Sequence, residues 1–105
     1  MILRTWRGWT RREDADGYFE YLAKTGVKDI EATPGNHGVL LTRREEDGRT
    51  EFLFMSLWDS LEAVKGFAGP DPERAVFYPE DDGYLVEKDE HIDHWDVLRA
   101  PPGLE

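Results

Sequence analysis

The side chains best suited to acid–base chemistry in this chain are His94 and Tyr78. An imidazole changes its charge near neutral pH, so His94 can act as a general base or a proton shuttle. Tyr78 and Arg4 carry donors that can orient a phenolate or carbonyl oxygen. The sequence therefore predicts His94 and Tyr78 as catalytic residues and Arg4 as a substrate-binding residue. The competing interpretation of His94 is a hydrogen-bonded residue in or near a subunit interface.

Aromatic residues make up 12% of the chain and can line an apolar chamber. Those predicted to contact a substrate are Trp6, Trp58, Phe67 and Phe77. Ordinary packing in the core or in a dimer interface is the alternative role for each of them.

A metal site is not expected. The chain has no cysteine. His91 and His94 are three residues apart in an expected strand, and such side chains point to opposite faces of a sheet, so they cannot converge on one ion.

The segment 51–69 contains two of these residues, Trp58 and Phe67. Between Phe52 and Trp58 both faces of the expected strand are apolar, although a single antiparallel sheet in a small domain usually buries one face. Helices of this chain can cover one face. A second copy is expected to cover the other, which predicts a homodimer formed through the sheet faces. Asp59 and Glu62 have the spacing of a capping box and predict a helix that ends at Gly69.

The other elements follow from hydrophobic periodicity and turn residues. Strands are expected over 2–9, 36–44 and 90–98, with a shorter extended segment over 84–87, and the turn 46–48 should join two strands as a hairpin. Helices are expected over 15–23, with Gly26 as its C-cap, briefly over 27–32, and over 73–78, with a loop at 79–83. The order βαββαβ predicts an α+β, ferredoxin-like split βαβ fold, in which helices cover one face of a four-stranded antiparallel sheet. Residues 1–99 form one domain and 100–105 a flexible tail.

The charge balance excludes several partners. Thirteen basic and 23 acidic residues give a net charge of −10, which disfavours nucleic acid and anionic membranes. No apolar run is long enough to span a bilayer, and the chain is expected to be cytoplasmic. Residues 1–12 are basic and 80–96 are acidic, either as two solvated faces or as segments that meet.

Several motifs together resemble the antibiotic biosynthesis monooxygenase-like family of the dimeric α+β barrel superfamily. They are Trp6-Arg7-Gly8, the run 34–38 (PGNHG), the run 58–69 (WDSLEAVKGFAG), the run 75–81 (AVFYPED) and the run 94–97 (HWDV). The resemblance implies a dimer whose two sheets close into one barrel, with a pocket between sheet and helices in each subunit.

The resemblance also suggests an activity. Some members oxidise polycyclic aromatic substrates with molecular oxygen and without metal or flavin, and this chain is expected to act as such a cofactor-independent monooxygenase on a small aromatic molecule. The alternative is a non-enzymatic ligand-binding or stress-associated dimer, since a shared fold does not determine a reaction.

Haem cleavage, known in other members, is less expected. The haem-cleaving relatives use a histidine after the second helix, a tryptophan within it and an asparagine in the first strand. The matching positions here are near Phe77, at Phe67 and near Trp6, so the nitrogen ligand for iron is missing.

Overall fold

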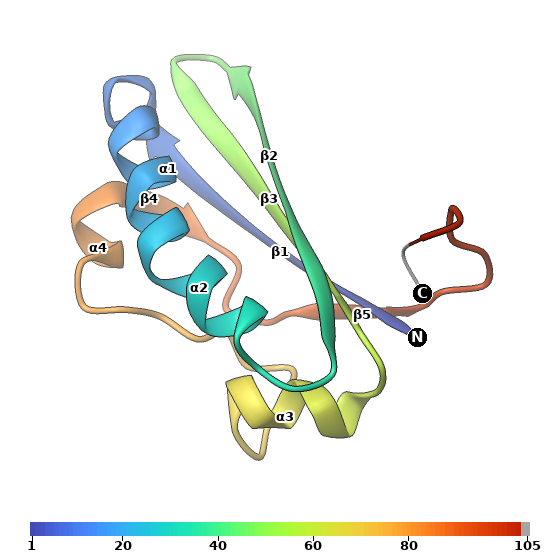
Figure 1. Ribbon diagram of the computed structural model, residues 1–105. Helices are drawn as coiled ribbons and strands as arrows, with labels where there is room; N and C mark the ends of the chain where they lie inside the picture. Colours follow the sequence, from blue (N-terminus) through green and yellow to red (C-terminus); the bar gives the residue numbers. More distant parts are fainter. Residues whose placement is uncertain (104–105) are drawn as a thin grey trace.

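The computed structural model describes residues 1–103 and consists of a twisted antiparallel sheet with helices packed on one face (Figure 1). Its strands are β1 (Ile2–Arg11), β2 (Asn36–Glu46), β3 (Arg49–Trp58), β4 (Leu85–Lys88) and β5 (Asp93–Asp96). Its helices are the 3-10 turn η1 (Arg12–Asp14), α1 (Ala15–Lys24), α2 (Gly26–Glu31), α3 (Leu61–Ala68) and α4 (Asp81–Tyr84). The expected α+β class and ferredoxin-like arrangement are confirmed.

The sheet is built around β1, with strand order β2-β3-β1-β4 and β5 also paired with β1. Every pairing is antiparallel. The β2–β3 turn is the predicted hairpin. Asp47 and Gly48 have φ values of 50° and 77°, and a type I′ turn requires positive φ at both of its central residues. The candidate site residues belong to β1, β3, α3, β5 or the segment between α3 and α4.

The two faces of the sheet have different surroundings. Phe52, Phe54 and Trp58 of β3 are buried beneath the helices. On the opposite face, which we call the open sheet face, Trp9 and Glu51 are buried. The other apolar side chains of this face are partly buried or exposed, namely Leu3, Leu40, Leu53, Met55, Leu57 and Trp95.

The last strand differs from the prediction. The extended segment expected over 84–87 is β4, which pairs with Gly8–Thr10, and the strand expected over 90–98 is the shorter β5, which pairs with Ile2–Thr5. Between them, the carbonyl of Asp89 accepts a 2.8 Å hydrogen bond from Nε1 of Trp6, and the chain at Ile92 turns into the core. Residues 90–92 pair with the segment before α4 and not with β1, as the bridge between Arg74 and His91 shows.

That same pairing explains a wrong helix prediction. Residues 73–78 form no helix, because the backbone N–H of Ala75 donates to Glu90 and that of Ile92 donates to Glu73. Asp71 and Pro72 resemble an N-cap residue followed by proline at the first helical position, a pattern that predicts a helix. Here they form a local turn, in which the carboxylate of Asp71 accepts from the N–H of Glu73. The helix in this region is α4, which begins in the expected loop 79–83 and ends at Tyr84, the first residue of the expected extended segment 84–87.

Two helix boundaries also differ. The N-cap of α3 is Ser60, whose hydroxyl accepts from the N–H of Ala63, and not Asp59. Glu62 pairs with Lys65 instead of closing a capping box. Gly26 begins α2 and does not cap α1. A side chain there would meet Phe54 and Tyr78 at 3.8 Å.

The basic and acidic segments meet within one chain, where Arg7 and Asp89 form an ion pair of 3.0 Å. No helix within residues 1–103 is long and apolar enough to cross a membrane. The predicted tail 100–105 remains a prediction, and its residues 104–105 lie outside the described part of the chain.

Candidate functional site

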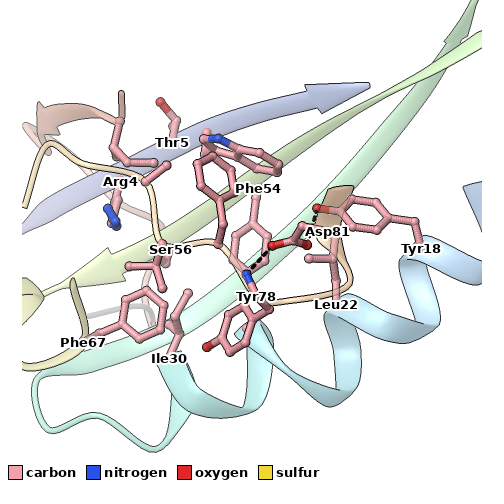
Figure 2. Close-up of a pocket in the computed structure, with 16 residues that line it drawn as sticks. Arg4, Thr5, Tyr18, Leu22, Ile30, Phe54, Ser56, Phe67, Tyr78 and Asp81 are labelled. Carbon is pink, nitrogen blue, oxygen red and sulfur yellow. Dashed lines mark hydrogen bonds between the residues drawn. The ribbon is translucent and has the colours of Figure 1, made fainter. Parts of the chain in front are cut away.

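A cavity of about 60 Å³ lies between the covered face of the sheet and the helices. Strands β1 and β3 form its floor, α1, α2 and α3 contribute walls, and residues 75–81 close it from the remaining side (Figure 2). Most of its lining is apolar. Ligand pockets usually measure about 300 Å³ or more, so the cavity in this conformation can hold water and not an aromatic ring.

Five of the predicted residues line this cavity: Arg4, Trp6, Phe67, Phe77 and Tyr78. They come from β1, from α3 and from the segment before α4. The indole of Trp6 meets the ring of Phe77 edge-on, with centroids 6.1 Å apart. The two rings thus form one continuous apolar surface.

The other two predicted residues lie outside the lining. Trp58 is fully buried behind Phe67, at a centroid distance of 6.5 Å. Its Nε1 donates a 2.8 Å hydrogen bond to the hydroxyl of Ser56, which does line the cavity. His94 sits directly opposite Arg4 in the β1–β5 register.

The sequence did not identify Asp81 as a site residue. This residue is 3% exposed and borders the cavity, and its carboxylate accepts from the Tyr18 hydroxyl at 3.2 Å and from the Tyr78 backbone N–H at 2.6 Å. Burial raises the pKa of Asp81, partly offset by these two hydrogen bonds. In the sequence it is one of many acids in a polar run, and only its place in the first turn of α4 turns it inward.

Tyr78 connects the closing segment to α2. Its hydroxyl donates to the carboxylate of Asp29 at 2.5 Å, and burial together with this hydrogen bond raises the pKa of Tyr78. Tyr78, Phe67 and Val76 also line an outer depression of about 490 Å³ between α2 and α3. These three side chains separate the inner cavity from that depression and so form its mouth.

Arg4 is a buried cation at the end of the cavity opposite Asp81 (Figure 2). Burial lowers the pKa of Arg4 to about 10, so the guanidinium stays charged at neutral pH. Its hydrogen bond is a long one of 3.4 Å from Nη1 to the carbonyl of Pro72.

His94 is held neutral by its surroundings. Burial, and then the charge of Arg4, lower the pKa of His94 from its ordinary 6.5, while Glu73 and Asp93 oppose the shift. Its Nε2 is buried and has no hydrogen-bond partner among the described residues.

The lowered pKa of His94 predicts how the stability of the protein depends on pH. As the pH falls below 6.5, the ordinary pKa of histidine, the unfolded imidazole takes up a proton that the folded His94 refuses, so the free energy of unfolding decreases. We expect His94→Gln to lose less stability than the wild type between pH 7 and pH 5, measured by urea denaturation. The exposed His91→Gln serves as control and should match the wild type. Equal pH dependence of the wild type and His94→Gln would refute the prediction.

The comparisons with known proteins agree with this architecture. A family model described as antibiotic biosynthesis monooxygenase matches residues 8–75. The chain belongs to this family. The match spans β1 to the segment after α3, which includes Phe67 and Ala75 of the cavity lining. No curated protein matches the chain.

Solved structures show the same fold. A protein of Bacillus cereus named as a candidate antibiotic biosynthesis monooxygenase superposes with a TM-score of 0.68 at 16% identity, covering 97% of each chain. A mutant of MhuD, solved with two manganese protoporphyrin IX molecules per active site, superposes with a TM-score of 0.62 at 17% identity, covering 98% of this chain and 100% of the other. At these identities the likeness concerns the fold alone.

The residues present here do not fit a haem. The cavity lining, which lies wholly within the described residues, contains no imidazole, thiolate or thioether to ligate iron. Tyrosine can ligate iron as a phenolate, but Tyr18 and Tyr78 both donate to carboxylates, and burial raises the pKa of each. Within residues 1–103 no group of three or more His, Asp or Glu side chains is arranged to hold a metal ion.

Proposed function

We propose that this protein is a monooxygenase that oxidises a small aromatic substrate with molecular oxygen, using only its own side chains. The observation that carries the proposal is the buried carboxylate of Asp81 on the wall of an otherwise apolar cavity. A base with a raised pKa in a water-poor site is suited to remove a proton from a weakly acidic aromatic substrate. Family membership supports the reaction class.

The reaction balances without a further reductant. For an anthrone-type substrate, Asp81 takes a proton from the ring CH₂ and leaves a carbanion. The carbanion transfers electrons to O₂ and forms a carbon–oxygen bond, which gives a peroxide. Loss of the second C–H proton then breaks the O–O bond, so that CH₂ and O₂ become C=O and H₂O.

The predicted residues take distinct parts in this proposal. Trp6, Phe67 and Phe77 contact the substrate ring, and Trp58 supports Phe67 from behind. Tyr78 is the second ionisable group of the wall and donates to a substrate oxygen once the mouth opens. His94 lies beside Arg4 and keeps the role that the sequence predicts for it, a base or proton shuttle.

Substrate entry requires the mouth to widen. The cavity of about 60 Å³ is separated from the outer depression of about 490 Å³ by Phe67, Val76 and Tyr78. The backbone that carries Val76 and Tyr78 belongs to no helix or strand, and such segments rearrange at lower cost than packed elements. Breaking the hydrogen bond between Tyr78 and Asp29 joins the two spaces.

Oxygen uptake tests the function. The wild-type protein is incubated with anthrone-type and quinol-type compounds in the presence of a strong chelator, and oxygen consumption and product mass are recorded. We expect that the chelator does not change the oxygen uptake. When the reaction is run under ¹⁸O₂, we expect one ¹⁸O atom in the product. Absence of uptake across the panel would refute the proposal.

A second candidate function is that of a non-enzymatic dimer, ligand-binding or stress-associated, whose aromatic residues mainly pack the core. The small volume of the cavity favours this candidate, because a closely packed interior leaves little room for a substrate and oxygen. Binding of aromatic compounds with no oxygen uptake would select this candidate.

We also propose that the protein is a homodimer through the open sheet face. Leu40 and Trp95 on that face are 60% and 55% exposed, and contiguous exposed apolar side chains mark interaction surfaces. We expect Leu53→Glu to be monomeric at micromolar concentration by light scattering, because a carboxylate there would be buried unpaired. Leu61→Glu, at an exposed site on α3, should remain dimeric. A monomeric wild type would refute the dimer.

The location of the protein in the cell remains a prediction from the sequence, which favours the cytoplasm.

A further inference from the structure

Arg4 differs from most other arginines of the described chain in lacking a carboxylate partner. Its residue is 5% exposed, yet no Asp or Glu within residues 1–103 forms an ion pair with it. By contrast, six arginines near the protein surface pair with carboxylates, namely Arg7, Arg11, Arg12, Arg43, Arg44 and Arg49. A buried charge without a partner is strongly unfavourable. The folded protein therefore carries a cost at Arg4 that its described side chains do not offset.

The donors of Arg4 are largely unused. A guanidinium has five N–H donors, and the hydrogen bond of Arg4 within residues 1–103 is the 3.4 Å contact with the carbonyl of Pro72. The ring centroid of Phe67 lies 5.9 Å from its central carbon and adds a cation–π contact. Because Arg4 lines the cavity, an acceptor for its remaining N–H donors can be placed in that cavity.

Two more donors flank Arg4 across the sheet. Ser56 is directly opposite Arg4 in the β1–β3 register, and His94 is directly opposite it in the β1–β5 register. Directly opposed residues share one face of the sheet, with Cβ atoms about 5 Å apart. The Ser56 oxygen already accepts from Trp58, which leaves its own O–H to donate, and Nε2 of His94 is buried without a partner among the described residues. Ser56, Arg4 and His94 thus form a row of under-used hydrogen-bonding groups.

We propose that Arg4 and Ser56, the two members of this row that line the cavity, bind the negatively charged oxygen of an anionic aromatic ligand, a carboxylate or a phenolate, with Arg4 as its counter-charge. The cavity walls beyond Arg4 are the rings of Phe54, Phe67 and Phe77, which suit a flat apolar body. Asp81 at the far end would repel a second negative group. The site therefore selects a ligand with one anionic end and an apolar remainder.

The inference rests on the proposed function for the identity of the reacting ligand, because an aromatic anion is also the electron-rich form that reacts with oxygen. The pairing with Arg4 is tested separately with probes that oxygen does not attack. Benzoate and 2-naphthoate are compared with their neutral isosteres benzamide and 2-naphthamide, and binding is followed by tryptophan fluorescence and calorimetry.

We expect each carboxylate to bind the wild type about 10- to 100-fold more tightly than its amide, as a hydrogen-bonded charge pair provides. Arg4→Gln should abolish this preference while raising the thermal midpoint of the free protein, since it removes an unpaired buried charge. Arg74→Gln is the matched control, because Arg74 is exposed and also has no carboxylate partner within residues 1–103. It should leave the preference unchanged.

Equal binding of acid and amide to the wild type, a preserved preference in Arg4→Gln, or no binding of either carboxylate would each overturn the inference. Failure of the proposed function gives a different result. If the carboxylates bind selectively through Arg4 but no substrate supports oxygen uptake, the anion site stands and the oxygenase proposal falls.

Discussion

Asp81→Asn is expected to lower the rate of oxygen uptake by about 10²- to 10⁴-fold, the usual contribution of a general base. The asparagine oxygen can accept from the Tyr78 backbone N–H, and its amide N–H can donate to the Tyr18 hydroxyl, so the wall of the cavity is retained while the proton acceptor is lost. In the wild type, activity should rise with pH through the pKa of Asp81, which burial places above the ordinary 3.8, because the carboxylate must be ionised to take a proton.

The neighbouring Asp82→Asn is the control. Asp82 is exposed and pairs with Lys88 at 2.8 Å, so its loss removes the same charge outside the cavity. Its activity should stay within about twofold of the wild type, because exposed ion pairs contribute little. If Asp81→Asn retained full activity while folded, the base would be another group, and Tyr78 would be the next to test with Tyr78→Phe.

Trp58→Ala is expected to destabilise the protein by about 3–5 kcal/mol, the usual cost of removing a large buried aromatic side chain. Trp58 is 0% exposed, packs against Phe67, and its indole N–H is satisfied by Ser56. The substitution leaves a cavity and removes the partner of the Ser56 hydroxyl, and both effects lower the free energy of unfolding measured by urea denaturation.

Phe19→Ala is the matched control for this prediction. Phe19 lies on the outer side of α1 and is 49% exposed, so its removal should cost about 0.5 kcal/mol. Equal losses in the two variants would mean that Trp58 does not hold the core under Phe67. In that case the proposal that Trp58 supports the cavity wall behind Phe67 would be wrong.

The fold class could be predicted from the sequence. The helix periodicity of 15–23 and the alternation of 52–58 are local signals, and the Asp47-Gly48 turn has its own backbone requirement. Periodicity also directs Trp6 and Phe67 toward the covered face of the sheet, and five of the seven predicted site residues line one cavity. These features depend on neighbours a few residues away, and such neighbours are visible in a sequence.

The remaining features depend on contacts between segments that are distant in the sequence. The segment 73–78 follows a helical initiation pattern, yet pairing of residues 73–75 with residues 90–92 prevents a helix, since backbone hydrogen bonds to a distant segment outweigh a weak local preference. In the sequence, Asp81 cannot be distinguished from the other acids of the polar segment around it. Its burial follows from its place in the first turn of α4, where it accepts from the Tyr18 hydroxyl.

The isolation of Arg4 likewise becomes visible only when all of its neighbours are in place. A missing counter-charge is a property of the assembled interior, because each candidate acid has first to be placed elsewhere by long-range contacts. The chain thus encodes its sheet and helices locally, whereas the charges of its cavity are set by contacts between segments far apart in the sequence.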